Sequence, residues 1–190
     1  MSPLLEPTTL GDLKLKNRVI LAPLTRSRAT GADGRTPNEL MLEVTDAVVS
    51  VWGASRVGMH LAPRGDAHSV GDTDPAATFG HVARELGRRK IAFICARESL
   101  GQNRIGPQLK KEFGGAYIAN EGFTRETAEE VLIKGEADAV GFGVSFLSNP
   151  DLPERFRNKQ PLNAPNFETF YAEGAVGYTD YPVYHETVTV

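Results

Sequence analysis

Short apolar segments alternate with longer amphipathic segments along most of this chain. The apolar segments have the length of buried strands and cover residues 18–24, 57–61, 91–96, 116–119 and 139–142. The segments between them carry the start and stop signals of helices. This alternation is typical of parallel β/α units, in which helices cover a sheet of parallel strands. The sequence therefore predicts an α/β fold with five inward-facing strands.

The first long helix is predicted over residues 36–53. Thr36 is a candidate N-cap, Pro37 suits the first helical position, and Glu39 can complete a capping box. Gly53 suits the left-handed residue that follows a helix. Its apolar residues fall on one stripe, formed by Leu40, Met41, Val44, Val48, Val51 and Trp52.

Three further helices are expected along the rest of the chain. Asp74-Pro75 opens one that ends at Gly87, and its apolar stripe is formed by Phe79, Val82, Ala83 and Leu86. A shorter helix covers residues 107–113. Thr124 caps the third, which is stopped by Gly135.

Two segments stand outside the alternation. Residues 8–15 are expected to form a small hairpin, because Gly11-Asp12 supplies turn chemistry between two short alternating runs. Residues 161–190 are rich in Pro, Asn, Gly and Tyr, and we expect a long loop there.

Composition excludes several classes of function. The chain has 190 residues, 41% of them hydrophobic and 24% charged, as in an ordinary globular domain. A net charge of -3 gives no reason to expect nucleic acid or an anionic membrane as partner. His68 and His81 have no partner at ligand spacing, so no metal site is expected. No signal peptide or membrane span is recognisable, so the expected location is the cytoplasm.

Cys95 is the single cysteine of the chain. An internal disulfide is therefore excluded, which fits a reducing compartment. Because Cys95 lies within an apolar run, we expect a buried structural thiol rather than a nucleophile.

Glycines follow the last two predicted strands, in Asn120-Glu121-Gly122 and Gly143-Val144. In β/α barrels the active site lies at the C-terminal ends of the strands, and the last two loops commonly hold a phosphate. Glycines allow backbone amides to approach a phosphate closely, but they also serve simple turns. From the residues alone both interpretations remain open.

Five motifs, in a fixed order, carry a resemblance to a known family. They are Ala22-Pro23-Leu24-Thr25-Arg26, Phe142-Gly143, Ser148-Asn149-Pro150-Asp151-Leu152, Glu168-Thr169-Phe170-Tyr171 and Gly177-Tyr178-Thr179-Asp180-Tyr181-Pro182. Together they resemble the Old Yellow Enzyme family, most closely its xenobiotic (glycerol trinitrate) reductases. The resemblance implies a TIM (β/α) barrel that binds FMN. It also implies hydride transfer from NAD(P)H through flavin N5 to activated alkenes or nitrate esters.

The resemblance also implies roles for particular residues. Pro23, Leu24 and Thr25 would flank the flavin ring, with the Thr25 hydroxyl bonded to flavin O4. The backbone of Asn120, Glu121 and Gly122 and of Gly143 and Val144 would hold the FMN phosphate. Tyr171 would line the substrate side, so Thr25 and Tyr171 are the catalytic candidates.

Two positions depart from the pattern of many family members. His60 stands where they have an arginine beside the flavin pyrimidine edge, and Val144 stands where they have one on the phosphate. A guanidinium offers a permanent charge and a bidentate fork that neither residue replaces. The glycerol trinitrate and xenobiotic reductase subgroup looks similar to this chain at both positions, and Arg64 could then supply the missing charge. His60 either binds flavin or is an ordinary histidine at a strand end.

The chain is short for such a barrel, which typically needs about 250 residues. Residues 1–41 resemble the hairpin and first unit, residues 42–160 the fourth helix to the eighth unit, and residues 161–190 the C-terminal tail. We therefore expect one incomplete domain with about five of eight units. Strands two to four, the substrate-binding His/Asn or His/His pair and the proton-donating tyrosine would then be missing.

Three functions follow from this shortened barrel and remain open. The chain is an FMN enzyme, a non-catalytic FMN-binding module, or an inactive remnant. Because each interior layer of a barrel takes side chains from alternate strands, an open barrel is expected to be marginally stable as a monomer. Open strand edges favour a homodimer.

Overall fold

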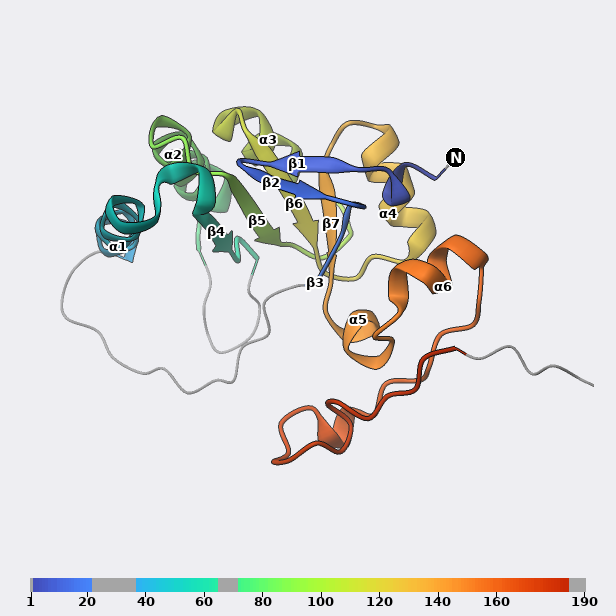
Figure 1. Ribbon diagram of the computed structural model, residues 1–190. Helices are drawn as coiled ribbons and strands as arrows, with labels where there is room; N and C mark the ends of the chain where they lie inside the picture. The colour runs from blue at the N-terminus through green and yellow to red at the C-terminus, as the bar shows by residue number, and fades with distance from the viewer. Residues whose placement is uncertain (1, 22–36, 65–71, 185–190) are drawn as a thin grey trace, which may run out of the picture.

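A sheet of five parallel strands forms the centre of the molecule (Figure 1). The computed structural model describes residues 2–21, 37–64 and 72–184. The strands are β3 (Val19–Leu21), β4 (Gly58–Leu61), β5 (Phe93–Arg97), β6 (Ala116–Asn120) and β7 (Ala139–Phe142). Their spatial order is β3-β7-β6-β5-β4, so the first strand of the sheet pairs with the last, as in a β/α barrel. The prediction of a truncated barrel with five strands is confirmed.

The two faces of the sheet bury different side chains. The outer face packs on helices, and its strand residues include Ile94, Tyr117, Ala119 and Val140. The inner face has a smaller cluster formed by Leu10, Cys95, Ile118 and Ala139. Since alternate residues of a strand point to opposite faces, Phe93, Cys95 and Arg97 all belong to the inner face.

The predicted hairpin lies against the inner cluster. It consists of β1 (Thr8–Leu10) and β2 (Leu13–Leu15), paired antiparallel. Gly11 turns the chain with a φ of 57°. A Cβ there would lie 2.3 Å from the Ser55 carbonyl oxygen and 2.5 Å from the Ala92 Cβ, so only glycine fits without a shift.

Helices α2 (Pro75–Arg88), α3 (Gly106–Phe113) and α4 (Arg125–Ile133) pack on the outer face. The expected caps are present. The Asp74 carboxylate accepts a hydrogen bond from the Ala77 amide at 3.0 Å. The Thr124 hydroxyl accepts one from the Thr127 amide at 3.3 Å.

The expected role of Gly87 as a helix end is wrong. Helix α2 continues to Arg88, and Gly87 lies within it. A Cβ on Gly87 would lie 2.4 Å from the Phe113 carbonyl oxygen. The glycine therefore serves the close packing of α2 on α3.

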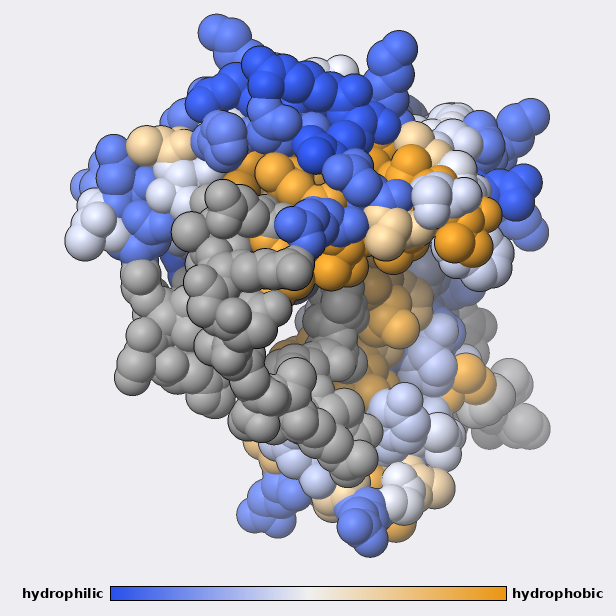
Figure 2. Space-filling model, turned by 90° about the vertical axis from the view of Figure 1, so that its left-hand side faces the viewer, coloured by the Kyte–Doolittle hydropathy of each residue, from blue (hydrophilic) through white to orange (hydrophobic). Residues whose placement is uncertain are grey.

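The expected helix α1 (Pro37–Trp52) is present, but most of its apolar stripe is not buried. The exposed members are Leu40, Val44, Val48, Val51 and Trp52, at 38–75% relative exposure. The buried side of α1 is instead centred on Thr45, with Met41, Leu42 and Val49 packed against the core. Figure 2 views the molecule from the α1 side and shows apolar patches within a largely hydrophilic surface. Thr36 and the Glu39 side chain lie outside the described residues.

Two short helices after β7 were not expected from the sequence. They are α5 (Val144–Ser148) and α6 (Leu152–Asn158). Arg155 of α6 is buried, and its guanidinium donates to the Asp151 carboxylate at 2.7 Å and to the carbonyl oxygens of Pro161 and Pro182. These bonds hold the C-terminal segment against α6.

The C-terminal segment has little regular structure, as expected. Within residues 161–184 the single regular element is the 3-10 helix η3 (Phe167–Thr169). Two other 3-10 turns, η1 (Pro3–Leu5) and η2 (Ala54–Arg56), lie earlier in the chain. Within the described residues, no helix is both long and apolar enough to span a bilayer.

Candidate functional site

The C-terminal ends of the parallel strands all lie at one end of the sheet. In Figure 1 this end faces α5 and the C-terminal segment. The strand register places Arg97 beside Asn120 and Asn120 beside Gly141. Gly141 in turn lies beside Ile20 of β3. These four residues form the last inner row of the sheet, which we call the mouth row.

Asn120 is buried and already committed to the sheet. Its side-chain Nδ2 donates to the Gly141 carbonyl oxygen at 2.9 Å. Its own carbonyl oxygen accepts from the Glu98 amide at 3.0 Å. The Asn120 side chain therefore links β6 to β7.

The turn after β6 has an unusual backbone. Glu121 and Gly122 have φ values of 90° and 76°, so both are in the left-handed region. A Cβ on Gly122 would meet nothing within 4 Å, so the backbone there faces open space. A non-glycine residue held at positive φ is uncommon and often marks a functional turn.

Arg97 is the functional candidate that sequence reasoning missed. It ends β5, and its Nε donates to the Glu121 carboxylate at 3.1 Å. Both side chains are partly exposed, at 40% and 32%. Alternation along β5 could have indicated it, because a charged residue two positions after the inner residue Cys95 must face the mouth.

His60 lies at the mouth, close to Arg97. It pairs in register with Cys95 and so belongs to the inner face. It has no hydrogen-bond partner in the described part of the chain. Partial desolvation lowers the pKa of its imidazole, and the positive charge of Arg97 lowers this pKa further. His60 therefore favours its neutral form at pH 7.

Arg64, which the sequence offered as a source of the missing charge, is bonded to a loop in the structure. Its guanidinium donates to the carbonyl oxygens of Gln102 and Asn103, at 3.0 and 3.4 Å. It therefore holds the loop after β5.

Gly143 and Val144 come directly after β7. Gly143 is the N-cap of α5, and Val144 is its first residue, with 39% of its surface exposed. The two glycine-containing turns after β6 and β7 lie at the same end of adjacent strands, as the sequence suggested.

Tyr171 follows η3 in the C-terminal segment and is 69% exposed. Among the described residues, no hydrogen bond or ring contact joins it to the mouth row. Pro23, Leu24 and Thr25 lie outside the described residues, as does His68. No cluster of three or more His, Cys, Asp or Glu side chains suited to a metal ion occurs within residues 2–21, 37–64 and 72–184.

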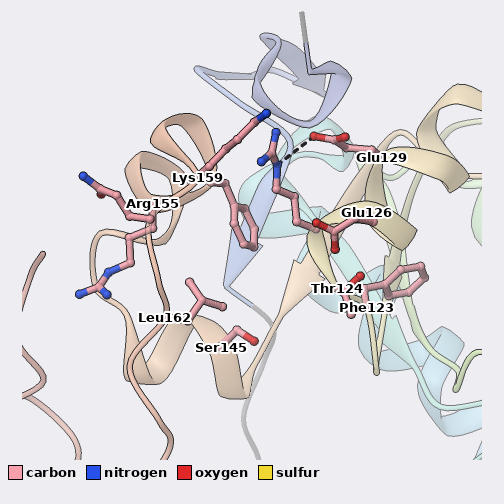
Figure 3. A pocket seen from close by; sticks show the side chains of 11 residues that line it. Phe123, Thr124, Glu126, Glu129, Ser145, Arg155, Lys159 and Leu162 are labelled. Carbon is pink, nitrogen blue, oxygen red and sulfur yellow. Dashed lines mark hydrogen bonds and ion pairs between the residues drawn. The ribbon is translucent and has the colours of Figure 1, made fainter.

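A cavity of about 580 Å³ lies between α4 and α6 (Figure 3). Side chains of both signs line it, among them Glu126, Glu129, Arg155 and Lys159. Arg125 donates to Glu129 at its rim, at 3.2 Å. None of the expected site residues lines this cavity, but Phe123 and Ser145 do, and they directly follow Gly122 and Val144, so the cavity adjoins the two glycine turns.

Comparison with known proteins identifies the family. Residues 35–163 match the NADH:flavin oxidoreductase / NADH oxidase family. The chain belongs to this family. The resemblance to Old Yellow Enzymes is thereby confirmed.

Related sequences and structures agree with this assignment. 12-oxophytodienoate reductase 2 of Arabidopsis thaliana is 38% identical over 156 residues, which cover 77% of this chain and 41% of that protein. An old yellow enzyme homologue from Zymomonas mobilis superposes with a TM-score of 0.74 and 34% identity, covering 81% of this chain and 46% of that one. Morphinone reductase in complex with tetrahydroNAD gives a TM-score of 0.74 and 37% identity, covering 85% and 47%. The chain thus spans less than half the length of each of these relatives.

The mouth has features that suit a phosphorylated flavin. Gly141 leaves the end of β7 without a side chain, and Gly122 presents open backbone. Arg97 adds a guanidinium on the inner face, where it can meet an anion. The Glu121 carboxylate would repel an anion, but its negative charge is already paired with Arg97. The residues present therefore fit FMN at this end of the sheet.

Proposed function

We propose that this chain binds FMN at the mouth and acts as an Old Yellow Enzyme-type NAD(P)H oxidoreductase. One observation carries the proposal: the glycine turns after β6 and β7, Arg97 and His60 gather at the C-terminal ends of the strands in a member of this flavin-dependent family. When bound, FMN would supply the redox chemistry that links a nicotinamide reductant to an activated alkene or a nitrate ester.

The residues of the chain would bind and orient the reactants. Backbone amides around Gly122 and Gly143 would hold the phosphate. Thr25 would bond flavin O4, and Pro23 and Leu24 would flank the ring. The neutral His60 imidazole would lie at the pyrimidine edge, where it can donate or accept a hydrogen bond.

Tyr171 requires a movement in this proposal. It is exposed, and its segment is held by hydrogen bonds of Arg155 and Asn163 to Pro182 and of the Tyr184 amide to Asp151. To line the substrate side of a flavin, the segment would have to fold over the mouth. Ordering of a loop around a ligand is a common way to complete such a site.

A second candidate is FMN binding without catalysis. The sheet is open, with β3 and β4 at its two edges, and this favours a protein that binds FMN without turning it over. Strands two to four of the full barrel would carry the substrate-binding pair and the proton donor, and our proposal places their loss between residues 41 and 42. Orientation and proton transfer each contribute orders of magnitude to a rate.

The test is the visible absorption of the purified chain, with and without added FMN, followed by NADPH oxidation with and without 2-cyclohexenone or a nitrate ester. Bound flavin with acceptor-dependent oxidation supports the enzyme. Bound flavin that is not turned over supports the binding module. Protein that takes up no flavin contradicts both and leaves an inactive remnant.

We further propose that two copies associate through the open side of the sheet. The support is the pair of edge strands β3 and β4 together with the exposed apolar stripe of α1 next to β4 in the chain. Edge strands offer unpaired backbone groups to a second chain. Sedimentation equilibrium over a range of concentrations tests this proposal, and a monomer at every concentration would contradict it.

A reducing compartment, such as the cytoplasm, is proposed for the protein. The support is Cys95, which is buried and free. We propose no nucleic-acid or membrane partner, because the net charge is -3. Fractionation of cells that express the native gene would test the location.

A further inference from the structure

Arg97 supplies a positive charge next to two glycine turns that carry none of their own. Val144, directly after Gly143, is aliphatic, and neither glycine turn carries a cation. A phosphate monoester carries nearly two negative charges at pH 7.5. Backbone amides alone leave most of this charge unbalanced, so a cation on the inner face would strengthen binding.

The direction of the Arg97 side chain follows from the strand register. Arg97 is the Cα partner of Asn120 and lies on the same face as Cys95, which is packed in the inner cluster. Its guanidinium reaches across to Glu121, in the turn after the neighbouring strand β6. The cation is thus already within one residue of the open backbone at Gly122.

Two other arginines in the described part of this end, Arg64 and Arg104, are engaged elsewhere. Arg64 donates to the loop carbonyls of Gln102 and Asn103. Arg104 is mostly buried, lies over the Phe123 ring and pairs with Glu98, which caps α3 from the outer core. Of these three arginines, Arg97 is therefore the best placed to meet an anion at the mouth.

The partner of Arg97 can be exchanged. The Arg97–Glu121 pair is partly exposed, and such pairs contribute only about 0–1 kcal/mol. A phosphate offers more charge than a carboxylate and the same bidentate geometry for a guanidinium. Glu121 sits in a left-handed turn that points its carboxylate at this guanidinium, so it both positions Arg97 and competes with an incoming anion.

We propose that Arg97 binds the phosphate group of FMN, and that it does so by exchanging its ion pair with Glu121 for the phosphate oxygens. The inference rests on the proposed FMN site and adds its principal cation. It predicts that the preference of the protein for FMN over riboflavin, which lacks the phosphate, depends on Arg97.

The experiment measures dissociation constants of FMN and riboflavin by quenching of flavin fluorescence at pH 7.5. Wild-type protein is compared with Arg97→Leu, Arg97→Lys, Glu121→Gln and the control Arg64→Leu. Arg97→Leu should weaken FMN binding about 10- to 100-fold, the usual loss for a charge-assisted hydrogen bond. Riboflavin binding should change less than about twofold in the same variant, because it makes no contact through a phosphate.

The remaining variants separate charge from other effects. Arg97→Lys should keep part of the preference for FMN over riboflavin, because lysine retains the positive charge but cannot bind the phosphate in the bidentate geometry of a guanidinium. Glu121→Gln should tighten FMN about two- to fivefold by removing a competing carboxylate. Arg64→Leu should leave both constants unchanged. If Arg97→Leu does not fold, as judged by its thermal melt, Arg97→Lys decides, and an unchanged FMN preference there overturns the inference.

The outcomes distinguish this inference from the proposed function. Wild-type protein that binds neither flavin overturns both. Wild-type protein that prefers FMN, with an Arg97→Leu variant of equal preference, overturns the inference alone. An equal loss of both flavins in Arg97→Leu also overturns it, because the residue would then act on the ring or the fold. Loss of preference in Arg64→Leu instead would assign the phosphate to Arg64.

Discussion

At the scale of single residues, Gly87 is a position where helix propensity favours alanine but close packing requires glycine. Alanine is favoured over glycine inside a helix by about 0.8–1.0 kcal/mol. At Gly87, however, a Cβ would lie 2.4 Å from a backbone oxygen of Phe113, which cannot move without shifting α3. We expect Gly87→Ala to lower the free energy of unfolding by about 1–3 kcal/mol, the usual cost of overpacking, as measured by urea denaturation.

Gly80 in the same helix is the control for this prediction. A Cβ on Gly80 would meet the end of the Glu112 side chain at 2.6 Å, and this flexible group can move aside. Gly80→Ala should therefore be neutral or stabilising. Equal effects of the two substitutions would show that α2 and α3 do not approach each other as closely as described.

Cys95 predicts a specific dependence of stability on alkaline pH. Burial raises the pKa of its thiol from 9.0 to about 12. Because the neutral thiol is favoured in the folded state, its contribution to stability is fully present below pH 9 and is lost as the pH rises from 9 towards 12. Cys95→Ala should flatten this part of a plot of unfolding free energy against pH. Buried Tyr117 also has a raised pKa and is present in both proteins, so the difference between them isolates the thiol.

The roles of single residues could be predicted where they depend on neighbours in the sequence. Cys95 lies in an apolar run and is buried, and the capping roles of Asp74 and Thr124 depend on local backbone geometry. Arg97 was missed because a charge after an apolar run marks the end of a strand as readily as a site. Its partner Glu121 is 24 residues away, and only the pairing of β5 with β6 brings them together.

At the scale of elements, α1 shows what periodicity can establish. The stripe of apolar residues predicted a helix, and the helix is present. Periodicity gives the apolar face of a helix but not the element that covers it. In this structure the buried side turns towards Thr45, and the stripe faces outward. A neighbouring helix of a complete barrel, or a second chain, would be needed to cover it.

We expect Val51→Lys to weaken self-association of the chain. Val51 is 75% exposed on the apolar stripe, and a lysine there would place an unpaired charge in any apolar interface. Ile133→Lys is the matched control, because Ile133 is 74% exposed at the end of α4, an element that we do not place in the interface. Sedimentation equilibrium should show a larger dissociation constant for Val51→Lys alone. The same shift in both variants would indicate a general effect of charge.

Most elements were predictable, and those that were missed have a common cause. The strands and longer helices are bounded by glycines, prolines and caps that act within a few residues. Helices α5 and α6 have five and seven residues, too few to show a period, and α6 is held by Arg155 through bonds to distant carbonyl oxygens. Such contacts depend on the folded chain and leave no local pattern.

At the scale of the whole molecule, the open sheet couples stability to ligand binding. Layers of side chains inside a barrel need strands on every side. Among the described residues, the inner buried cluster has four members, Leu10, Cys95, Ile118 and Ala139, whereas the outer core is much larger. The inner face is therefore the weaker half of the structure, and it is also the face on which we place FMN.

The melting temperature should consequently rise with FMN concentration. A ligand at 100 times its dissociation constant stabilises the folded state by about 2.7 kcal/mol. For a domain of this size, 1 kcal/mol shifts the melting temperature by roughly 2–4 °C, so we expect a rise of about 5–10 °C in differential scanning calorimetry. Inorganic phosphate at the same concentration is the control and should give a much smaller shift, because it lacks the ring that would cover the inner face. A sharp transition that FMN leaves unchanged would mean that the five strands are stable alone and that the mouth does not bind the flavin.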